Sequence, residues 1–331
     1  MSNIIKRTVE RENLSAVFYC EFFHSKIVYM KEKIREEQGL VPKLKYKYQL
    51  NVNGRYAESA LTMKYAEGKA MIIIGEKLNG SIPSVAKAIS EKDADLIRER
   101  AKMQSEAGAT FLDVCASVEE DVEVETLKWM IDLVQEVSDT PICIDSPSAR
   151  SCVAAIPFCK KPGLINSVSL EGDKIDTIFP VIADTDWECV ALLCDNDGIP
   201  DSVERRMKIF FGIMEKAKQY HIAPSRLHID PLVVTLGTDQ TALTVFADCC
   251  RRIKYEYPEI HITSGLSNIS FGLPVRKNIN QAFMVLAMNA GMDSAIVDPT
   301  NKNMIGMIYA TDALLERDEY CLNYIEKFNA K

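Results

Sequence analysis

The sequence predicts an α/β protein built as a closed (β/α)8 barrel. From residue 71 onward, short apolar runs alternate with helical patterns. The runs are apolar at successive positions, as in strands that a parallel sheet buries on both faces. Eight such units in about 260 residues match the usual length of this fold. An open, doubly wound sheet is the alternative, but no G-x-G-x-x-G turn follows the first run.

The expected strands recur at intervals of one βα module. They span residues 71–75, 110–114, 141–144, 163–167, 187–194, 226–229, 260–264 and 294–297. The segments between them carry apolar residues every three or four positions, which is the pattern of a helix with one face on a core. One such stripe consists of Leu243, Phe246, Ala247, Cys250 and Ile253.

Residues 1–70 differ from the rest of the chain, and we expect a poorly defined N-terminal extension ahead of a barrel at 71–331. They mix charged and aromatic residues without sustained periodicity, apart from a short amphipathic stretch at 27–37. The first strand begins on Met71. The hypothesis is that Met71 is the natural start or that 1–70 is loosely attached. The intact mass of the native protein tests the first possibility.

Composition and charge exclude several classes of protein. The chain has 331 residues and is 47% hydrophobic, so it can bury a sizeable core. Residues 71–331 hold 26 Lys and Arg against 39 Asp and Glu, because 1–70 holds 13 against 8 of the totals of 39 and 47. An acidic barrel is a poor binder of nucleic acid or of an anionic membrane. No apolar run approaches the roughly 18 residues of a membrane span, and no signal peptide is recognised.

The cysteines and histidines point to a cytoplasmic protein that binds no metal. The ten cysteines form no C-x-x-C pair and no zinc spacing, which is typical of free thiols in a reducing compartment. The four histidines are scattered along the chain, so no metal ion is expected. The cysteines are at positions 20, 115, 143, 152, 159, 189, 194, 249, 250 and 321.

Polar residues stand at or just beyond the ends of most expected strands, and in a barrel these ends meet at one mouth. They are Glu76, Asn79, Asp113, Asp145, Asn166, Asp195, Asp230, Ser267 and Asn268, and the last two follow the turn at Gly265. The absence of Lys and His from this set argues against a Schiff-base aldolase. Asp298 after the last strand disfavours a phosphate site there.

Carboxylates and carboxamides at one mouth suit a neutral heterocycle that is rich in N–H donors. A carboxylate accepts two parallel hydrogen bonds from an N–H/NH2 edge, and a pterin offers such an edge. The number of aspartates leaves a divalent-metal hydrolase open, although metal barrels usually mix His with Asp.

Five motifs carry a resemblance to a known family. They are Gly75-Glu-Lys-Leu-Asn79, Cys143-Ile-Asp-Ser146, Ile165-Asn-Ser167, Ile229-Asp-Pro231 and Gly265-Leu-Ser-Asn-Ile-Ser270. In this order they resemble the methyltetrahydrofolate:corrinoid-protein methyltransferases. That family has pterin-binding barrels similar to the folate domain of cobalamin-dependent methionine synthase. The resemblance covers about residues 71–328.

The resemblance implies a role for each strand-end residue. Asn268 is implied to be a mobile amide near pterin N5 and, with Asp145, to be catalytic. The implied pterin-binding residues are Glu76, Asn79, Asp113, Asp145, Asn166, Asp230, Gly265, Ser267 and Asn268. Cys115 departs from the family, since many members have Asn there. Asp195 and Arg276 are candidates for contact with the glutamate tail or the partner, or are surface residues.

The implied reaction moves a methyl group between N5 of tetrahydrofolate and the cobalt of a corrinoid carried by a partner protein. Tetrahydrofolate and 5-methyltetrahydrofolate are the implied substrates, and a homodimer is expected by the same resemblance. Two alternatives stay open. One is a dihydropteroate synthase-like enzyme, which needs cationic groups for pyrophosphate that Ser267, Asn268 and Asp298 do not provide. The other is a non-catalytic folate-binding subunit.

Overall fold

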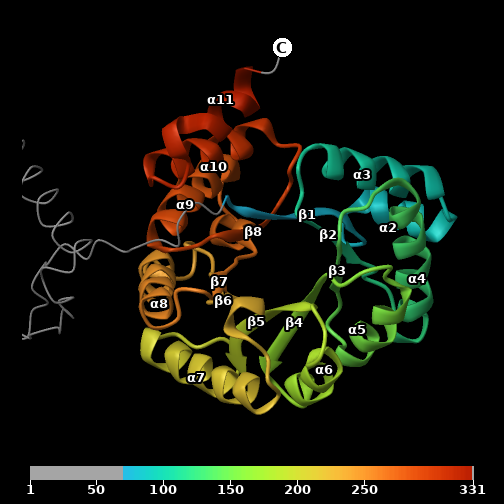
Figure 1. The fold of residues 1–331 in the computed structure, drawn as a ribbon, viewed down its shortest axis with the longest axis horizontal. Helices are drawn as coiled ribbons and strands as arrows, with labels where there is room; N and C mark the ends of the chain where they lie inside the picture. Colours follow the sequence, from blue (N-terminus) through green and yellow to red (C-terminus); the bar gives the residue numbers. More distant parts are fainter. Residues whose placement is uncertain (1–69, 330–331) are drawn as a thin grey trace, which may run out of the picture. The chain divides into compact units, whose positions relative to one another are not determined.

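The computed structural model describes residues 70–329, which form a ring of parallel strands surrounded by helices (Figure 1). The eight strands pair in the order β7-β6-β5-β4-β3-β2-β1-β8, so each strand up to β7 pairs with its neighbour in sequence. The predicted (β/α)8 barrel is confirmed. The expected extension lies outside the described residues, apart from Ala70.

Each strand overlaps the range that the sequence predicts. The strands are β1 (Ile72–Asn79), β2 (Phe111–Cys115), β3 (Ile142–Asp145), β4 (Leu164–Leu170), β5 (Glu188–Asp195), β6 (Leu227–Asp230), β7 (His261–Ile262) and β8 (Ser294–Val297).

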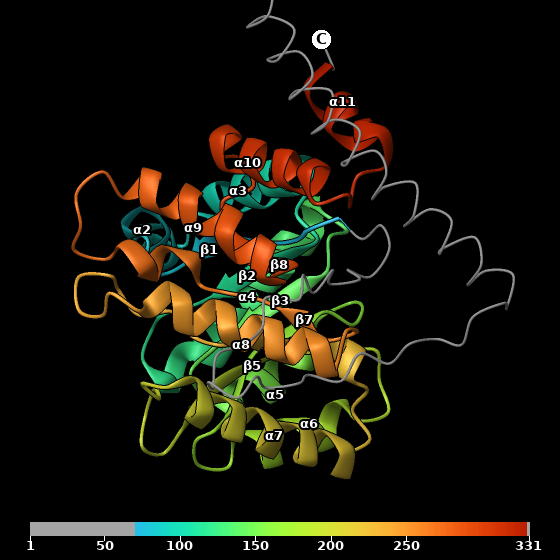
Figure 2. The same ribbon diagram turned by 90° about the vertical axis from the view of Figure 1, so that its left-hand side faces the viewer.

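Helices follow the strands and cover the outside of the barrel. Neighbours in sequence from α7 to α10 lie side by side (Figure 1 and Figure 2). The helices are α2 (Pro83–Glu91), α3 (Ala94–Glu106), α4 (Glu120–Val137), α5 (Ala149–Ala155), α6 (Lys174–Ile182), α7 (Val203–Gln219), α8 (Ala242–Glu256), α9 (Arg276–Ala290), α10 (Lys302–Leu314) and α11 (Leu322–Asn329). The short 3-10 helices are η1 (Ile156–Phe158), η2 (Pro224–Arg226), η3 (Leu266–Ser270) and η4 (Glu319–Cys321).

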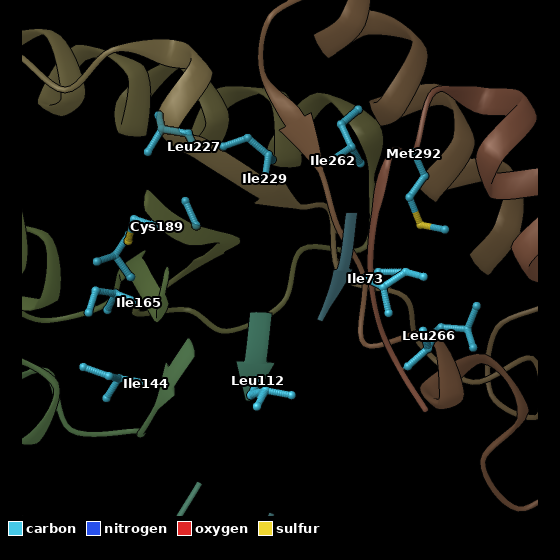
Figure 3. Packing of buried hydrophobic residues seen from close by; sticks show 14 of the residues in the cluster. Ile73, Leu112, Ile144, Ile165, Cys189, Leu227, Ile229, Ile262, Leu266 and Met292 are labelled. Atoms are coloured by element: carbon cyan, nitrogen blue, oxygen red, sulfur yellow. The ribbon is translucent and has the colours of Figure 1, made fainter. Parts of the chain in front are cut away.

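Both faces of the strands are buried, as their continuous apolar runs predict. One face packs against the helices, and Figure 3 shows Leu112, Ile144 and Ile165 in this layer. The alternate residues form a separate cluster made of strand residues alone, which places them inside the barrel. That inner cluster includes Ile74, Phe111, Cys143, Leu164 and Val190. The alternation therefore fixes which strand residues face the interior at the carboxyl end.

The barrel closes through a short seam between β7 and β8. The N–H of Asp293 donates to the carbonyl of Ile262 at 3.2 Å, and the N–H of Ile296 donates to that of Ser264 at 3.3 Å. The sequence predicts a strand at 260–264, but regular pairing covers two residues. The chain turns away from the strand direction at Gly265 and enters η3, so the regular ladder ends before the predicted strand does.

Candidate functional site

A row made of three predicted site residues and Cys115 crosses β1 to β4 at the carboxyl end of the barrel. Asn79 pairs in register with Cys115, Cys115 with Asp145, and Asp145 with Asn166. Partners in register point to the same face of a sheet. Cys143, two residues before Asp145, belongs to the inner cluster. The side chains of the row therefore face the interior of the barrel, as the mouth prediction requires.

Asp113 and Glu76 lie beside this row and add two more carboxyl groups to it. Asp113 is buried and accepts a hydrogen bond from Nδ2 of Asn166 at 3.5 Å. Burial, and then the charge of Asp145, raise the pKa of Asp113 well above its usual value. Burial also raises the pKa of Asp145 to about 6, and it raises the pKa of Glu76 despite the opposing charge of Lys77. A ligand that donates N–H groups would favour the charged forms here.

Cys115 takes part in the hydrogen bonding of the row as a neutral thiol. Its Sγ lies 3.2 Å from Oγ of Ser117, and that hydroxyl donates to Oδ1 of Asn79 at 3.3 Å. Burial raises the pKa of Asp145, and a hydrogen bond from Cys115 offsets part of this increase. Burial raises the pKa of the Cys115 thiol to about 12, so it donates rather than ionises. Cys115 thus supplies a hydrogen-bond donor to Asp145.

Asp230, at the end of β6, ties two loops of the mouth together. Its Oδ1 accepts the N–H of Leu232 at 2.8 Å, and its Oδ2 accepts the N–H of Gly265 at 3.4 Å. Burial raises the pKa of Asp230 to about 6, although these two bonds offset part of the effect. A carboxylate has about four acceptor positions, so two remain for a ligand. Asp230 therefore has a structural role in addition to the predicted one.

Asn268 and Ser267 are exposed within η3, just beyond Gly265. The N–H of Asn268 donates to the carbonyl of Gly265 at 3.2 Å. Nδ2 of Asn268 lies 3.5 Å from the place that a Cβ on Gly265 would occupy. Gly265 has a φ of −72°, which other residues also adopt, so its backbone angle does not require glycine. Its missing side chain leaves room beside the Asn268 amide.

Asp195 and Arg276 have local partners. Oδ1 of Asp195 accepts the N–H of Asp197 at 3.0 Å, within the turn that follows β5. Arg276 donates from Nη2 to the carbonyl of Ser267 at 2.6 Å and from Nε to Oγ of Ser270 at 3.0 Å. Asp195 thus stabilises a turn, whereas Arg276 is bound to the loop that carries Asn268.

Lys77 lies at the mouth, so the prediction that this mouth holds no lysine is wrong. Its Nζ is 3.0 Å from Oδ2 of Asp298, which follows β8. The pairing of β1 with β2 shifts register between Gly75 and Leu78. Strict alternation does not hold through such an irregularity, and the sequence gives no sign of it. The charge of Lys77 is balanced by Asp298.

Within residues 70–329, no cluster of three or more His, Cys, Asp or Glu side chains is arranged to hold a metal ion. In the same range, no helix combines the length and apolar character that crossing a membrane requires.

The family model of pterin binding enzymes matches residues 75–298, which include every strand end described above. This chain belongs to the pterin-binding enzyme family. The match begins inside β1 and ends just beyond β8, so the family's region and the barrel coincide.

Two curated relatives of this pterin-binding chain cover most of the barrel. A protein named methylcorrinoid:tetrahydrofolate methyltransferase, from Eubacterium limosum, is 54% identical over 260 residues, which are 78% of this chain and 96% of that protein. Methionine synthase from Mycobacterium leprae is 28% identical over 263 residues, 76% of this chain and 22% of that protein.

Solved dihydropteroate synthases share the fold at low sequence identity. The enzyme from Vibrio fischeri superposes with a TM-score of 0.58 at 18% identity, over 75% of this chain and 94% of that one. The enzyme from Yersinia pestis superposes with a TM-score of 0.56 at 16% identity, over 74% of this chain and 93% of that one. These similarities support the barrel architecture.

Proposed function

We propose that this protein is a methyltransferase that moves a methyl group between a corrinoid protein and N5 of tetrahydrofolate, in the direction of tetrahydrofolate. The observation that carries the proposal is the 54% identity, over 96% of its length, to the Eubacterium limosum protein whose name states this reaction. The interior row of amides and carboxylates supports it, because a pterin ring requires such groups.

The pterin ring lies at the carboxyl end of the barrel in this proposal. Asp230 and Asp145 accept hydrogen bonds from its N–H/NH2 edge, and the carboxamide of Asn166 meets its remaining polar atoms. The raised pKa values of Asp145 and Asp230 fit this role, since each buried carboxyl lacks a full set of donors. Glu76, Asn79, Asp113, Gly265 and Ser267 complete the proposed surroundings of the substrate.

Asn268 is the proposed catalytic amide beside N5, with Asp145 as the second catalytic group. The N5 lone pair forms a bond to the methyl carbon, the electron pair of the methyl–cobalt bond stays with the corrinoid, and N5 releases its proton to water. N5 bears positive charge while both bonds are partial. An oriented amide oxygen stabilises that charge more in the transition state than in the substrate complex.

The dihydropteroate synthase alternative needs cationic groups for a pyrophosphate leaving group. Ser267 and Asn268 stand on the loop after β7, and the lysine at the mouth is paired with Asp298. A paired cation has little attraction left for an added anion. These observations favour methyl transfer over the dihydropteroate synthase reaction. A turnover measurement decides whether the protein is instead a non-catalytic folate-binding subunit.

We also propose that the protein acts in the cytoplasm as a homodimer. The nine cysteines among the described residues are all free thiols, which fits a reducing compartment. Exposed apolar side chains near the carboxyl terminus offer a surface for pairing, with Leu314 80%, Tyr320 83% and Leu322 60% exposed.

The first test is an absorbance assay with methylcobalamin and tetrahydrofolate, run with and without the protein. Loss of the methylcobalamin spectrum that depends on both the protein and tetrahydrofolate is the expected result. Binding of tetrahydrofolate without turnover on free methylcobalamin or on any corrinoid protein would support the binding-subunit alternative instead.

A further inference from the structure

Arg276 binds the peptide group that leads directly into Asn268. Its Nη2 donates to the carbonyl oxygen of Ser267 at 2.6 Å, and this oxygen belongs to the Ser267–Asn268 peptide. The N–H of the same peptide donates to the carbonyl of Gly265 at 3.2 Å. Because a peptide group is planar, holding both its oxygen and its nitrogen fixes the position of the Asn268 Cα, from which the side chain extends.

A buried hydroxyl strengthens this attachment. Nε of Arg276 donates to Oγ of Ser270 at 3.0 Å, and that hydroxyl donates to the carbonyl of Ser267 at 3.3 Å. Ser270 is fully buried, so its hydroxyl is fixed in place. The guanidinium and the hydroxyl thus converge on one carbonyl oxygen, and the guanidinium makes charge-assisted bonds, which are stronger than neutral ones.

The start of α9 places Arg276 for this contact. Val275, the residue before the helix, has a φ of +50°, a left-handed conformation that is rare for a β-branched side chain. The guanidinium also lies over the ring of Phe271, 5.9 Å from its centroid. The side chain of Arg276, although exposed, is therefore directed back onto η3.

The opposite side of η3 is held by the loop after β6. The N–H of Leu236 donates to the carbonyl of Ile269 at 3.0 Å, and Oγ1 of Thr235 donates to the carbonyl of Phe271 at 2.7 Å. These contacts fix the end of η3, beyond Asn268. The peptide that precedes Asn268 is held by Gly265, Arg276 and Ser270.

We infer that Arg276 is a positioning residue, which orients Asn268 for methyl transfer by holding the Ser267 carbonyl. This inference rests on the proposed function of Asn268 but makes a separate statement about the loop. It replaces contact with a glutamate tail or a partner as the role of Arg276. Loss of the guanidinium lets the peptide rotate, so the amide spends less time in its productive orientation.

The test compares Arg276→Ala, Arg276→Lys and the control Lys277→Ala, which removes a neighbouring exposed cation. Hydrogen exchange of residues 266–271 is measured in the substrate-free protein, together with tetrahydrofolate affinity and the single-turnover rate with methylcobalamin. For Arg276→Ala we expect hydrogen exchange to be about tenfold faster and the single-turnover rate to be about tenfold lower. The affinity for tetrahydrofolate should stay within about threefold of wild type. The exchange and the rate of Arg276→Lys should lie between those of wild type and Arg276→Ala, because lysine keeps the charge but not the two-point contact.

A double-mutant cycle with Ser270→Ala adds an independent criterion. Since both side chains act on one carbonyl, the two effects on exchange should be less than additive. Unchanged exchange in Arg276→Ala would overturn the inference, and so would equal losses of affinity and rate, which indicate direct contact with the substrate. If the wild-type protein transfers no methyl group, the proposed function fails, and the exchange data still decide whether Arg276 holds the loop.

Discussion

Both carboxylate oxygens of Asp230 accept backbone N–H groups, one from its own loop and one from the loop after β7. Asp230→Ala removes a ligand acceptor and two loop contacts together, so Asp230→Asn is the more informative change. We expect either variant to lose on the order of 2–4 kcal/mol of tetrahydrofolate binding. Calorimetry measures this, with exposed Asp184→Asn as control. Wild-type affinity in both Asp230 variants would remove Asp230 from the site.

The same carboxyl predicts a pH dependence of binding. Burial raises the pKa of Asp230 to about 6, and in the proposed binding mode its charged form accepts the pterin N–H/NH2 edge. Tetrahydrofolate affinity should therefore fall as the pH drops through about 6, and the fall should be weaker in Asp230→Asn. The free energy of unfolding changes in the opposite sense. A raised pKa gives stability that is fully present below the ordinary carboxyl pKa and is lost as the pH rises through about 6.

Asn268 should affect the rate of methyl transfer more than the affinity for tetrahydrofolate. Asn268→Ala removes an oriented polar group, whose loss typically lowers a rate by about 10²–10³. Folding should survive, because the side chain is exposed in η3. Single-turnover kinetics beside a separate binding measurement tests this. A rate within about threefold of wild type at saturation would assign the catalytic role to another residue.

At the residue scale, the order of the strands predicts which of their residues become neighbours. Asp145 ends β3 and pairs in register with Asn166 inside β4, so their proximity follows from the order of the strands. The contacts of Lys77 and Arg276 could not be predicted in this way. A register shift in β1 places Lys77, and the contact of Arg276 is made across a loop. Spacing along the chain carries no information about such contacts.

At the scale of elements, α4 supports the end of β3 through a buried hydrogen bond. Oγ of Ser146 donates to Oε1 of Glu123 at 2.8 Å, and both residues are buried. The helical pattern predicts α4, but a charged residue on its inner face has no signal in apolar periodicity. Since Glu123 contributes to the raised pKa of Asp145, α4 also acts on the proposed site.

Glu123→Ala should lower the free energy of unfolding by about 1–3 kcal/mol, because it leaves the buried Ser146 hydroxyl without its acceptor. The matched control is Glu125→Ala, an exposed position on the same helix, where a change within about 0.5 kcal/mol is expected. Urea denaturation measures both. Equal stability of the two variants would show that the buried bond contributes nothing to the fold. Glu123→Gln should also lower the pKa of Asp145.

The barrel as a whole was predictable because its strands are apolar on both faces and its modules are regular. The seam between β7 and β8 was less predictable, because regular pairing in β7 covers only two residues and the turn into η3 determines where this strand ends. Residues 1–69 lie outside the described structure, so the expected division at residue 70 stays a prediction.

The proposed homodimer belongs to this scale. Leu322, Tyr320 and Leu314 expose apolar surface that pairing would cover. Sedimentation at micromolar protein is expected to show a dimer, and Leu322→Glu should shift it toward monomer, because burying a charge opposes association. A wild-type protein that sediments as a monomer at these concentrations would contradict the proposal.

The central claim is that this chain catalyses methyl transfer to tetrahydrofolate. The most direct measurement incubates the protein with tetrahydrofolate and a corrinoid carrying an isotope-labelled methyl group, and then locates the label by mass spectrometry. The account predicts labelled 5-methyltetrahydrofolate in proportion to protein and time, with formation strongly reduced in Asn268→Ala. Label that remains on the corrinoid, although the protein binds tetrahydrofolate, would contradict the account.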